Sequence, residues 1–435
     1  MKWFFGILLL LLAALAFRLG LLAYAMYVLL GLLVVSRFLA REWIGGLSAT
    51  RTSSQLTAQV NEAVAVGVTV HNRGRLPVPW VLMEDVVHWP PCINGPPPVK
   101  LRGKRLKISL LSRGGSTTLF YQVEFKQRGY YQIGPTVLES GDLFGLHRRF
   151  ESVTEPQFVL VFPRVVPLNG YDIASRRPIG EIRLTHRLYE DPTRISGVRL
   201  YELGDPLNRV HWRATARTGQ LHCKVYESTA IAGATILLDF HTADFDRRHE
   251  PYRSELAVSA AASVANALYQ MGQQLGLVTN GRDAAERIRT EGWRHDYRTR
   301  QAALAAGELS QRNDRLAPLV VDTRRGPEQL GRILELLARV ELTDGLTFSQ
   351  MVLETASRLP RDATLVVVIS DVTLETAVAL GNLRRRGFAI AAIVNLYEDS
   401  DYSRCAGLLL GEGIESRHLK DEQALSGICS RLVMR

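Results

Sequence analysis

The sequence predicts a membrane-anchored multidomain protein with two N-terminal transmembrane helices, a β-sandwich-like domain and a C-terminal doubly wound α/β domain. Two apolar stretches open the 435-residue chain, valine-rich alternating segments follow, and short apolar segments then alternate with amphipathic ones. A chain of this length is expected to form several domains. We predict a transmembrane helical hairpin over 1–45, the β-sandwich-like domain over 46–170, a connecting segment over 171–231 and the α/β domain over 232–435.

The N-terminal apolar region predicts a helical hairpin. Residues 3–17 and 19–35 are apolar, and Arg18 separates them. A single helix over both stretches would be about 50 Å long and would place Arg18 near the middle of a hydrocarbon core of about 30 Å. A hairpin instead places Arg18 at the far interface, where its long side chain reaches the headgroups. A cleaved signal peptide is the alternative, which the second apolar stretch disfavours.

Basic residues flank both ends of this hairpin, with Lys2 before it and Arg37 and Arg41 after it. Cytoplasmic flanks of membrane proteins carry an excess of Lys and Arg. We therefore expect the soluble body on the cytoplasmic side of the cell inner membrane. The formal net charge of +10 suits a protein beside an anionic membrane face. Nucleic-acid binding is not expected, because no helix-turn-helix or aromatic stacking platform is evident.

The first part of the body predicts a β-sandwich-like domain. Residues 60–72 alternate between valine and smaller or polar residues, and a turn signal follows at 71–74. Further short strands are expected at 78–87, 106–111, 117–124, 129–134 and 158–162. This spacing is typical of a β-sandwich. A proline-rich run over 94–98 cannot pair in a ladder and predicts a loop.

From residue 234 onward the pattern predicts a doubly wound α/β domain with a parallel sheet. Apolar strands are expected at 235–240, 275–279, 364–370 and 388–396, and amphipathic helices at 254–274, 328–340, 349–358 and 373–385. Such alternation is typical of a sheet with helices on both faces. Ligands of these sheets bind beyond the carboxyl ends of the strands, where Asp239 and Asp371 fall.

The segment 194–227 combines turn residues with closely interleaved polar and aromatic residues, which a plain linker does not need. Its candidate binding or structural residues are Tyr201, Gly204, Asp205, Pro206, Arg209, His211, Trp212, Ala216, Arg217 and Gly219. Asp205, His211 and Arg217 could form a general-base site. We favour a structural network that joins the two domains, with Trp212 packed between them, because a tryptophan beside β-like residues more often packs than protrudes.

These motifs resemble a known bacterial family. The run YELGDPLNRVHW over 201–212, with its continuation over 215–219, looks like the signature of the "domain of unknown function fifty-eight" family. The segments 128–135 and 141–146 and the paired N-terminal spans resemble that family too. The resemblance implies a von Willebrand factor A-like fold for the C-terminal domain. It also implies a frequent genomic association with MoxR-type AAA+ ATPases and transglutaminase-like membrane proteins. It implies no established activity.

The von Willebrand factor A-like resemblance also implies a possible Mg²⁺ site, built from Asp-x-Ser-x-Ser, a threonine and a later aspartate. Asp239 stands at the first position, but His241 and Ala243 replace both serines; Thr347 and Asp371 match the remaining positions. A hard cation needs several oxygen ligands, and imidazole is a poor ligand for Mg²⁺. We therefore predict a degenerate site at Asp239, Thr347 and Asp371, with no metal or other cofactor bound.

The predicted function is that of a non-enzymatic, membrane-tethered adaptor or scaffold. The sequence has no G-x-S-x-G elbow, no H-E-x-x-H motif and no phosphate-binding G-x-x-x-x-G-K-[ST] loop. The adaptor would bind protein partners, with a MoxR-type AAA+ ATPase as the candidate, in the assembly or maturation of membrane or envelope complexes. The alternative is a hydrolase-like enzyme that uses Asp205, His211 and Arg217.

Overall fold

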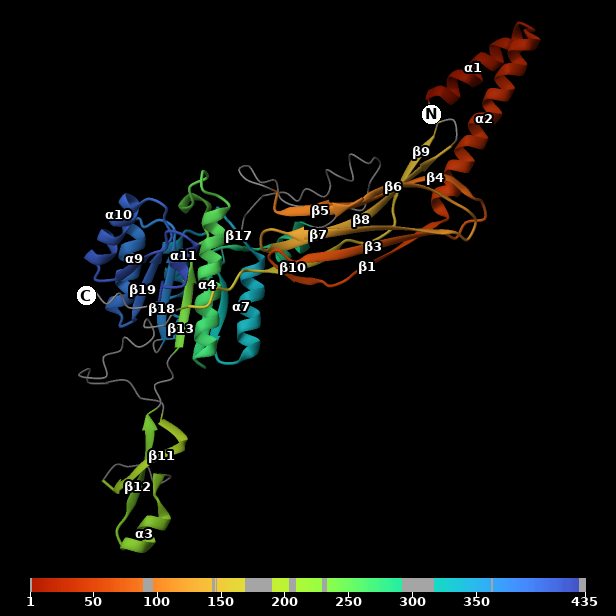
Figure 1. Ribbon diagram of the computed structural model, residues 1–435. Coiled ribbons are helices and arrows are strands. Elements are labelled where there is room, and N and C mark those ends of the chain that lie inside the picture. The colour runs from red at the N-terminus through yellow and green to blue at the C-terminus, as the bar shows by residue number, and fades with distance from the viewer. Residues whose placement is uncertain are drawn as a thin grey trace.

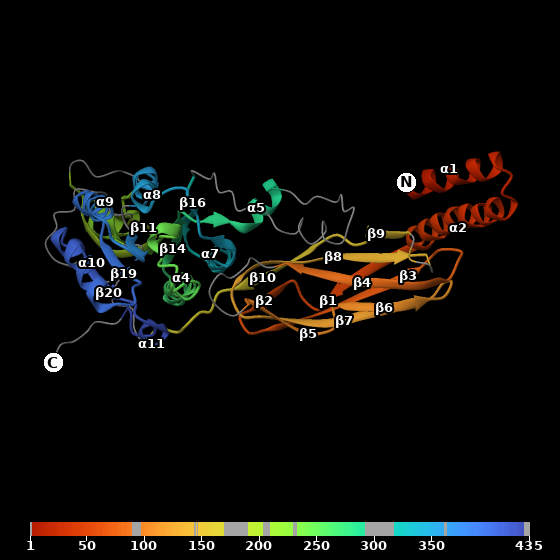
Figure 2. The same ribbon diagram turned by 90° about the horizontal axis from the view of Figure 1, so that it is seen from above.

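The computed structural model contains two N-terminal helices, a β-sandwich, a small hairpin and a C-terminal α/β domain (Figure 1). It describes residues 2–88, 97–142, 145, 147–168, 190–202, 209–228, 233–291, 317–360 and 363–429. The helices lie at one end of the sandwich and the α/β domain at the other, as Figure 2 shows from above. Of the loop predicted over 94–98, residues 94–96 lie outside the described part of the chain.

The predicted helical hairpin is present, with α1 (Lys2–Ala16) and α2 (Gly20–Gly45) on either side of a turn at Arg18. Arg18 adopts a left-handed conformation with a φ of 52°. Leu11 of α1 packs against Ala23 of α2 near this turn. By length and composition α2 could cross a membrane, whereas the apolar part of α1 is a shorter helix. The structure therefore supports one N-terminal membrane anchor.

The C-terminal third of α2 packs on the sandwich. Trp43 lies in the sandwich core and Ile44 is also buried. Ser36 Oγ lies 2.9 Å from His147 Nδ1, at hydrogen-bond distance. The part of α2 before Ser36 is about 25 Å long at 1.5 Å per residue, close to the length of α1. The two limbs of the helical hairpin are therefore nearly equal, and each is shorter than a hydrocarbon core of about 30 Å.

The β-sandwich consists of one sheet in the order β1-β3-β7-β5 and a second in the order β2-β10-β8-β4-β6, with β9 paired to β8. Its strands are β1 (Leu47–Ser53), β2 (Thr57–Gln59), β3 (Ala63–Asn72), β4 (Val78–His88), β5 (Val99–Gly103), β6 (Leu106–Leu111), β7 (Ser116–Phe125), β8 (Gly129–Gly141), β9 (Arg148–Ser152) and β10 (Gln157–Phe162). The alternating valines of β3, from Val64 to Val70, all point into the core between the sheets. The alternation therefore predicts this strand correctly.

The α/β domain contains a six-stranded sheet in the order β16-β14-β13-β18-β19-β20. Its principal elements are β13 (Gly233–Leu238), α4 (Tyr252–Gln270), β14 (Gln274–Thr279), β16 (Leu319–Arg324), α7 (Pro327–Arg339), α8 (Phe348–Thr355), β18 (Ala363–Ile369), α9 (Leu374–Arg385), β19 (Ile390–Val394), α10 (Asp399–Gly411), β20 (Glu415–His418) and α11 (Glu422–Leu425). Five strands are parallel, as predicted, whereas β16 pairs antiparallel with β14. An antiparallel edge strand is common on such sheets.

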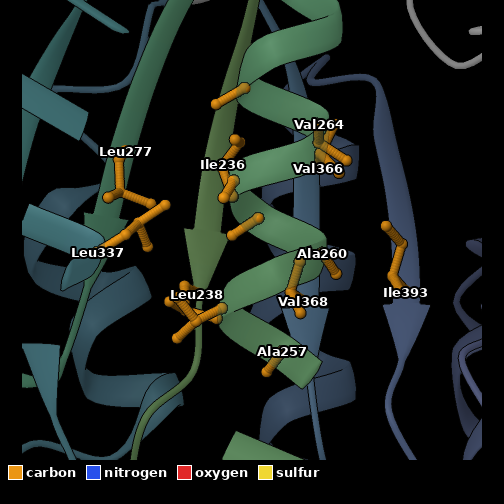
Figure 3. Packing of buried hydrophobic residues seen from close by; sticks show 14 of the residues in the cluster. Ile236, Leu238, Ala257, Ala260, Val264, Leu277, Leu337, Val366, Val368 and Ile393 are labelled. Carbon is orange, nitrogen blue, oxygen red and sulfur yellow. The ribbon is translucent and has the colours of Figure 1, made fainter. Parts of the chain in front are cut away.

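Helices cover both faces of this sheet. On one face α4 and α7 pack against alternate residues of the central strands, and Figure 3 shows Leu337 and the small side chains of α4 in this layer. On the other face α8, α9 and α10 pack against the intervening residues, which include Leu237 and Val367. Both faces of the central strands are buried, which explains their continuous apolar sequences.

One arginine joins the sandwich to the α/β domain. Arg128 lies in the turn before β8, and its guanidinium is buried. Its Nη1 donates to the carbonyl oxygens of Leu337, Ala338 and Val340 at 2.9, 3.3 and 2.7 Å. Its Nε lies 3.3 Å from Glu255 Oε1 on α4. The C-terminal carbonyls of a helix carry partial negative charge, so a cation is favoured there.

The chain that leaves the sandwich adds a second contact. Val165, Val166 and Leu168 pack against the core of the α/β domain. The backbone N–H of Val166 donates to Ser263 Oγ on α4 at 2.9 Å. The two domains are therefore joined by residues near 128 and 166, which precede the connecting segment.

Replacement of Arg128 by alanine should destabilise this interface. The change removes the donor to three carbonyl oxygens and leaves Glu255 without its cation, which should cost about 3 kcal/mol. Urea denaturation of the chain in detergent would measure the loss. Arg102→Ala is the control, because the ion pair of Arg102 with Glu124 at 2.9 Å is exposed and should contribute about 0.5 kcal/mol or less. Equal effects of the two changes would contradict the role of Arg128.

Candidate functional site

The segment singled out in the sequence forms a small separate unit, the signature hairpin. It consists of β11 (Glu190–Leu200), α3 (Trp212–Thr218) and β12 (His222–Ser228). The two strands pair antiparallel with each other and with no other described strand. Figure 1 shows this unit apart from both the sandwich and the α/β domain.

Local hydrogen bonds explain the fold of the signature hairpin. His211 caps α3, because its Nδ1 accepts a hydrogen bond from the backbone N–H of Ala214 at 3.0 Å. Gly219 ends α3 in a left-handed conformation with a φ of 72°, where glycine is favoured. Val210 forms an isolated bridge to Cys223, and both side chains are buried. These two residues form the buried apolar centre of the described part of this unit.

The prediction that Trp212 packs between the domains is wrong. Its side chain is 69% exposed, and α3 has no buried residue. Because α3 belongs to a unit that stands apart from both domains, no described residue of either domain covers it. Val198, Leu200 and Leu221 of the same unit are also largely exposed. The signature hairpin therefore presents apolar side chains outward, and Arg128 makes the interdomain contact that we expected from this segment.

The remaining signature residues do not form a catalytic cluster within the described residues. His211 Nδ1 accepts the capping hydrogen bond and so carries no proton, while Arg217 is exposed in the last turn of α3. No hydrogen bond or ion pair joins these two described side chains. Tyr201 and Arg209 are half-buried and Ala216 is exposed. Three of the predicted residues lie outside the described part of the chain: Gly204, Asp205 and Pro206.

A second candidate site lies at the carboxyl edge of the large sheet. From β13 the chain continues to β14 and β16 on one side, whereas β18, β19 and β20 extend the sheet on the other side. The strand order therefore reverses between β13 and β18. Asp239 and Asp371 follow these two strands. Ligands of doubly wound sheets bind in the crevice at this switch point.

Asp239 is held in a buried polar network. Its Oδ1 accepts hydrogen bonds from Asn280 Nδ2 at 3.0 Å and from the backbone N–H of His241 at 3.3 Å. Asn280 also accepts from the N–H of Phe240 at 2.7 Å and donates to a neighbouring loop carbonyl. Burial, and then the nearby carboxylate of Asp244, raise the pKa of Asp239 well above its ordinary value. The folded chain therefore holds a proton on Asp239 at a higher pH than an ordinary aspartate does, and a side-chain hydrogen bond joins Asp239 to Asp244.

The donor groups at this edge do not fit Mg²⁺. Thr347 Oγ1 caps α8 by accepting from the N–H of Gln350 at 3.4 Å. Asp371 Oδ1 accepts from Arg404 Nη2 at 3.2 Å. The Thr347 oxygen is used in the cap of α8 and the Asp371 carboxylate pairs with Arg404, so few oxygens of this set are free for a hard cation. Within the part of the chain that the structure describes, no three His, Cys, Asp or Glu residues are placed to hold a metal ion.

Sequence reasoning missed Asp244 and Asn280. Asn280 follows β14 as Asp239 follows β13, so its position after an apolar strand was a usable signal. Asp244 reaches Asp239 because a 3-10 turn over Thr242–Asp244 reverses the chain. A third polar residue at this edge is Asn395, which follows β19 and accepts from Arg253 Nη1 at 3.1 Å.

These features define a protein that combines an N-terminal apolar anchor helix, a β-sandwich and a doubly wound α/β domain with an inserted hairpin. Residues 197–401 match the model of the family described as "Protein of unknown function DUF58". The chain is 24% identical over 228 residues to "Uncharacterized protein YeaD" of Bacillus subtilis (strain 168), with 52% of this chain and 54% of that protein covered. The chain thus spans about half the length of this curated relative.

Solved structures resemble only part of the chain. The CARDB domain of PF1109 from Pyrococcus furiosus is 17% identical and covers 26% of this chain and 86% of its own, with a TM-score of 0.19. The PapD-like domain 7 of human CEP192 is 11% identical and covers 26% of this chain and 82% of its own, with a TM-score of 0.16. Scores this low support no conclusion about the chain.

Asp239→Asn should change the pH dependence of stability. Because the pKa of Asp239 is raised in the folded state, the folded chain keeps a proton that the unfolded chain releases above about pH 4. Wild-type stability at this site is therefore lost as pH rises from about 4 through the raised pKa. Asparagine can still donate to Asp244 but has no proton to lose. The stability of the variant relative to wild type should therefore increase between about pH 4 and pH 7.

Urea denaturation at several pH values would test this sign. Asp246→Asn is the control, because an exposed ion pair with Arg248 lowers the pKa of Asp246 to about 2. The stability that this ion pair contributes is present above about pH 4 and is lost as pH falls toward 2. The stability difference between Asp246→Asn and wild type should therefore change with pH in the opposite direction. If the stability difference between Asp239→Asn and wild type did not change with pH, the raised pKa of Asp239 would be contradicted.

Proposed function

We propose that the chain is a membrane-tethered, non-enzymatic adaptor whose signature hairpin binds a protein partner. The exposed side chain of Trp212 carries this proposal. A tryptophan exposes a large apolar area to water only at a cost, and Trp and Arg are the residue types most enriched among binding hot spots. Val198 and Leu200, two residues apart on β11, add exposed apolar area on one face of that strand.

The charge of the signature hairpin indicates the kind of partner. Arg199, Arg213 and Arg217 are exposed, and exposed Glu202 lies 3.8 Å from Arg199 as its ion-pair partner. A basic surface around an apolar centre favours a partner with an acidic surface around an apolar patch. Our candidate is a MoxR-type AAA+ ATPase, acting with this chain in the assembly or maturation of membrane or envelope complexes.

The enzyme alternative has less support. A general base must keep a ring nitrogen free to accept a proton from the substrate. His211 uses Nδ1 to cap α3, so only its Nε2 faces other partners, and that nitrogen carries the proton in the neutral ring. Arg217 is exposed and is not joined to His211 in the described residues. Binding is therefore the better account of this segment.

We also propose that both helices of the helical hairpin enter the inner membrane and that the C-terminal domain is von Willebrand factor A-like. The nearly equal limbs on either side of Arg18 favour the first point. The parallel sheet with helices on both faces and an aspartate at the switch point favours the second. The strand β8, with 13 residues and about 40 Å of length, would hold the α/β domain away from the membrane.

Trp212→Ala should abolish most of the binding while it leaves the fold intact. An exposed side chain contributes within about 0.5 kcal/mol to stability, whereas loss of a hot-spot tryptophan weakens binding by about 30-fold. The measurement is a titration of the full chain in nanodiscs with a purified MoxR-type ATPase. Phe120→Ala is the control, because Phe120 is an aromatic residue of similar exposure on the sandwich. Wild-type affinity of the Trp212 variant would contradict the role of the signature hairpin, and no binding by wild type would contradict the partner.

The topology can be tested with single cysteines in a Cys92→Ser background, where the other cysteines are buried. Glu354 is exposed on α8, so Glu354→Cys reports the side on which the body lies. We expect a membrane-impermeant maleimide to label Glu354→Cys only after lysis of spheroplasts. Arg18→Cys, at the turn between the helices, should be labelled from outside. Labelling of Glu354→Cys in intact spheroplasts would place the body on the opposite face.

A further inference from the structure

Two turns at the end of the sandwich that carries α2 line an open polar pocket. The pocket has a volume of about 330 Å³ and is lined by His71, Asn72, Arg73, Gly74, Arg113 and Gly114. The residues come from the turn between β3 and β4 and from the turn between β6 and β7. Ligand sites begin at volumes of about 300 Å³, so the pocket can hold a small polar group.

The walls of this pocket are fixed by backbone and amide hydrogen bonds. The backbone of Asn72 bonds to both Gly114 and Gly115 of the facing turn, at 3.1 and 2.9 Å. The buried side chain of Asn72 donates to the carbonyls of Leu76 and Ser112 and accepts from the N–H of Gly74. The two turns are therefore held together before any ligand binds, which reduces the entropy lost on binding.

The pocket lies directly at the foot of the anchor helix. The N–H of Arg73 donates to the carbonyl of Gly46, the residue after α2, at 2.8 Å. The backbones approach so closely that a Cβ on Gly46 would lie 2.7 Å from the Cα of Gly74. The last ten residues of α2, from Ser36 to Gly45, separate the pocket from the apolar part of the helix. This distance is about 15 Å along the axis, so the pocket lies beyond a headgroup layer of about 5 to 8 Å, and long arginine side chains reach back toward that layer.

The charge of this region is basic. Arg73 and Arg113 are exposed in the pocket wall, Arg75 is exposed beside it, and no acidic residue lines the pocket. Arg37 and Arg41 are exposed on the same end of α2, near Glu42. Guanidinium groups and backbone N–H groups at turns are the donors that bind phosphate oxygens. Each basic residue near an anionic membrane adds attraction for its headgroups.

We propose that this pocket binds the phosphodiester headgroup of an anionic phospholipid in the membrane that α2 enters. Arg73 and Arg113 would donate to the phosphate oxygens, and the fixed turns would hold the two guanidinium groups on either side of the headgroup. Such a contact would orient the sandwich relative to the membrane surface. The inference rests on the proposed membrane anchor, and it is independent of the proposed protein partner.

The test uses the purified full chain in detergent and short-chain phosphatidylglycerol, phosphatidylcholine and inorganic phosphate as separate probes. Retention of each lipid is measured by native mass spectrometry, and affinity by titration. We expect the wild-type chain to bind phosphatidylglycerol at least about tenfold more tightly than phosphatidylcholine. The double variant Arg73→Gln/Arg113→Gln should lose this preference.

A matched control removes the same charge elsewhere. Lys100→Gln/Lys104→Gln changes two exposed lysines on and just after β5, away from the two turns, and should keep the lipid preference. If the double arginine variant does not fold, the single variant Arg113→Gln replaces it, because Arg113 is exposed on a turn. Equal binding of the two lipids by wild type, or an unchanged preference in the arginine variants, would overturn the proposal. Inorganic phosphate that displaces the lipid at equal concentration would assign the pocket to soluble phosphate instead. A chain that stays in solution without detergent would contradict the anchor itself.

Discussion

The arrangement of the two large domains depends on the guanidinium of Arg128. It satisfies the carbonyls at the C-terminus of α7, which have no partners within the helix, and it lies near Glu255 of α4. A single side chain of the sandwich thereby fixes two helices that cover the same face of the α/β sheet. A buried cation is stable only with such compensation, so this contact specifies one relative orientation of the domains.

The same contact reaches the carboxyl edge of the sheet. The guanidinium carbon of Arg128 lies 5.4 Å from the centre of the Phe240 ring, a cation–π distance. Phe240 follows Asp239 directly, and its backbone N–H bonds to Asn280, which also holds Asp239. The sandwich therefore contacts the residue next to Asp239 of the Asp239–Asp244 carboxyl pair. A change at the switch point that moved Phe240 would therefore alter its contact with Arg128 at the interface between the domains.

Periodic burial was predictable from the sequence, and contacts between distant segments were not. The valines of β3 and the apolar runs of β13 and β18 face interiors that their own patterns specify. The burial of Trp212 depends on whether another surface covers it, and its β-like neighbours carry no such information. The pairing of Asp239 with Asp244 depends on a 3-10 turn, and the role of Arg128 depends on the position of α7, which lies 200 residues further along the chain. None of these has a local signature.

The signature hairpin is the least self-sufficient part of the described chain. Two-stranded units are marginally stable in water, because a short ladder buries too little apolar surface to offset the entropy of ordering the chain. Among the side chains of this unit that the structure describes, Val210 and Cys223 are buried and apolar, while Val198, Leu200 and Trp212 are exposed. A partner that covered these side chains would supply the missing apolar burial. Stability of the hairpin and affinity for the partner would then be linked, since a ligand that binds the ordered form stabilises it. Under the proposed function, this linkage would account for the apolar residues on the outside of so small a unit.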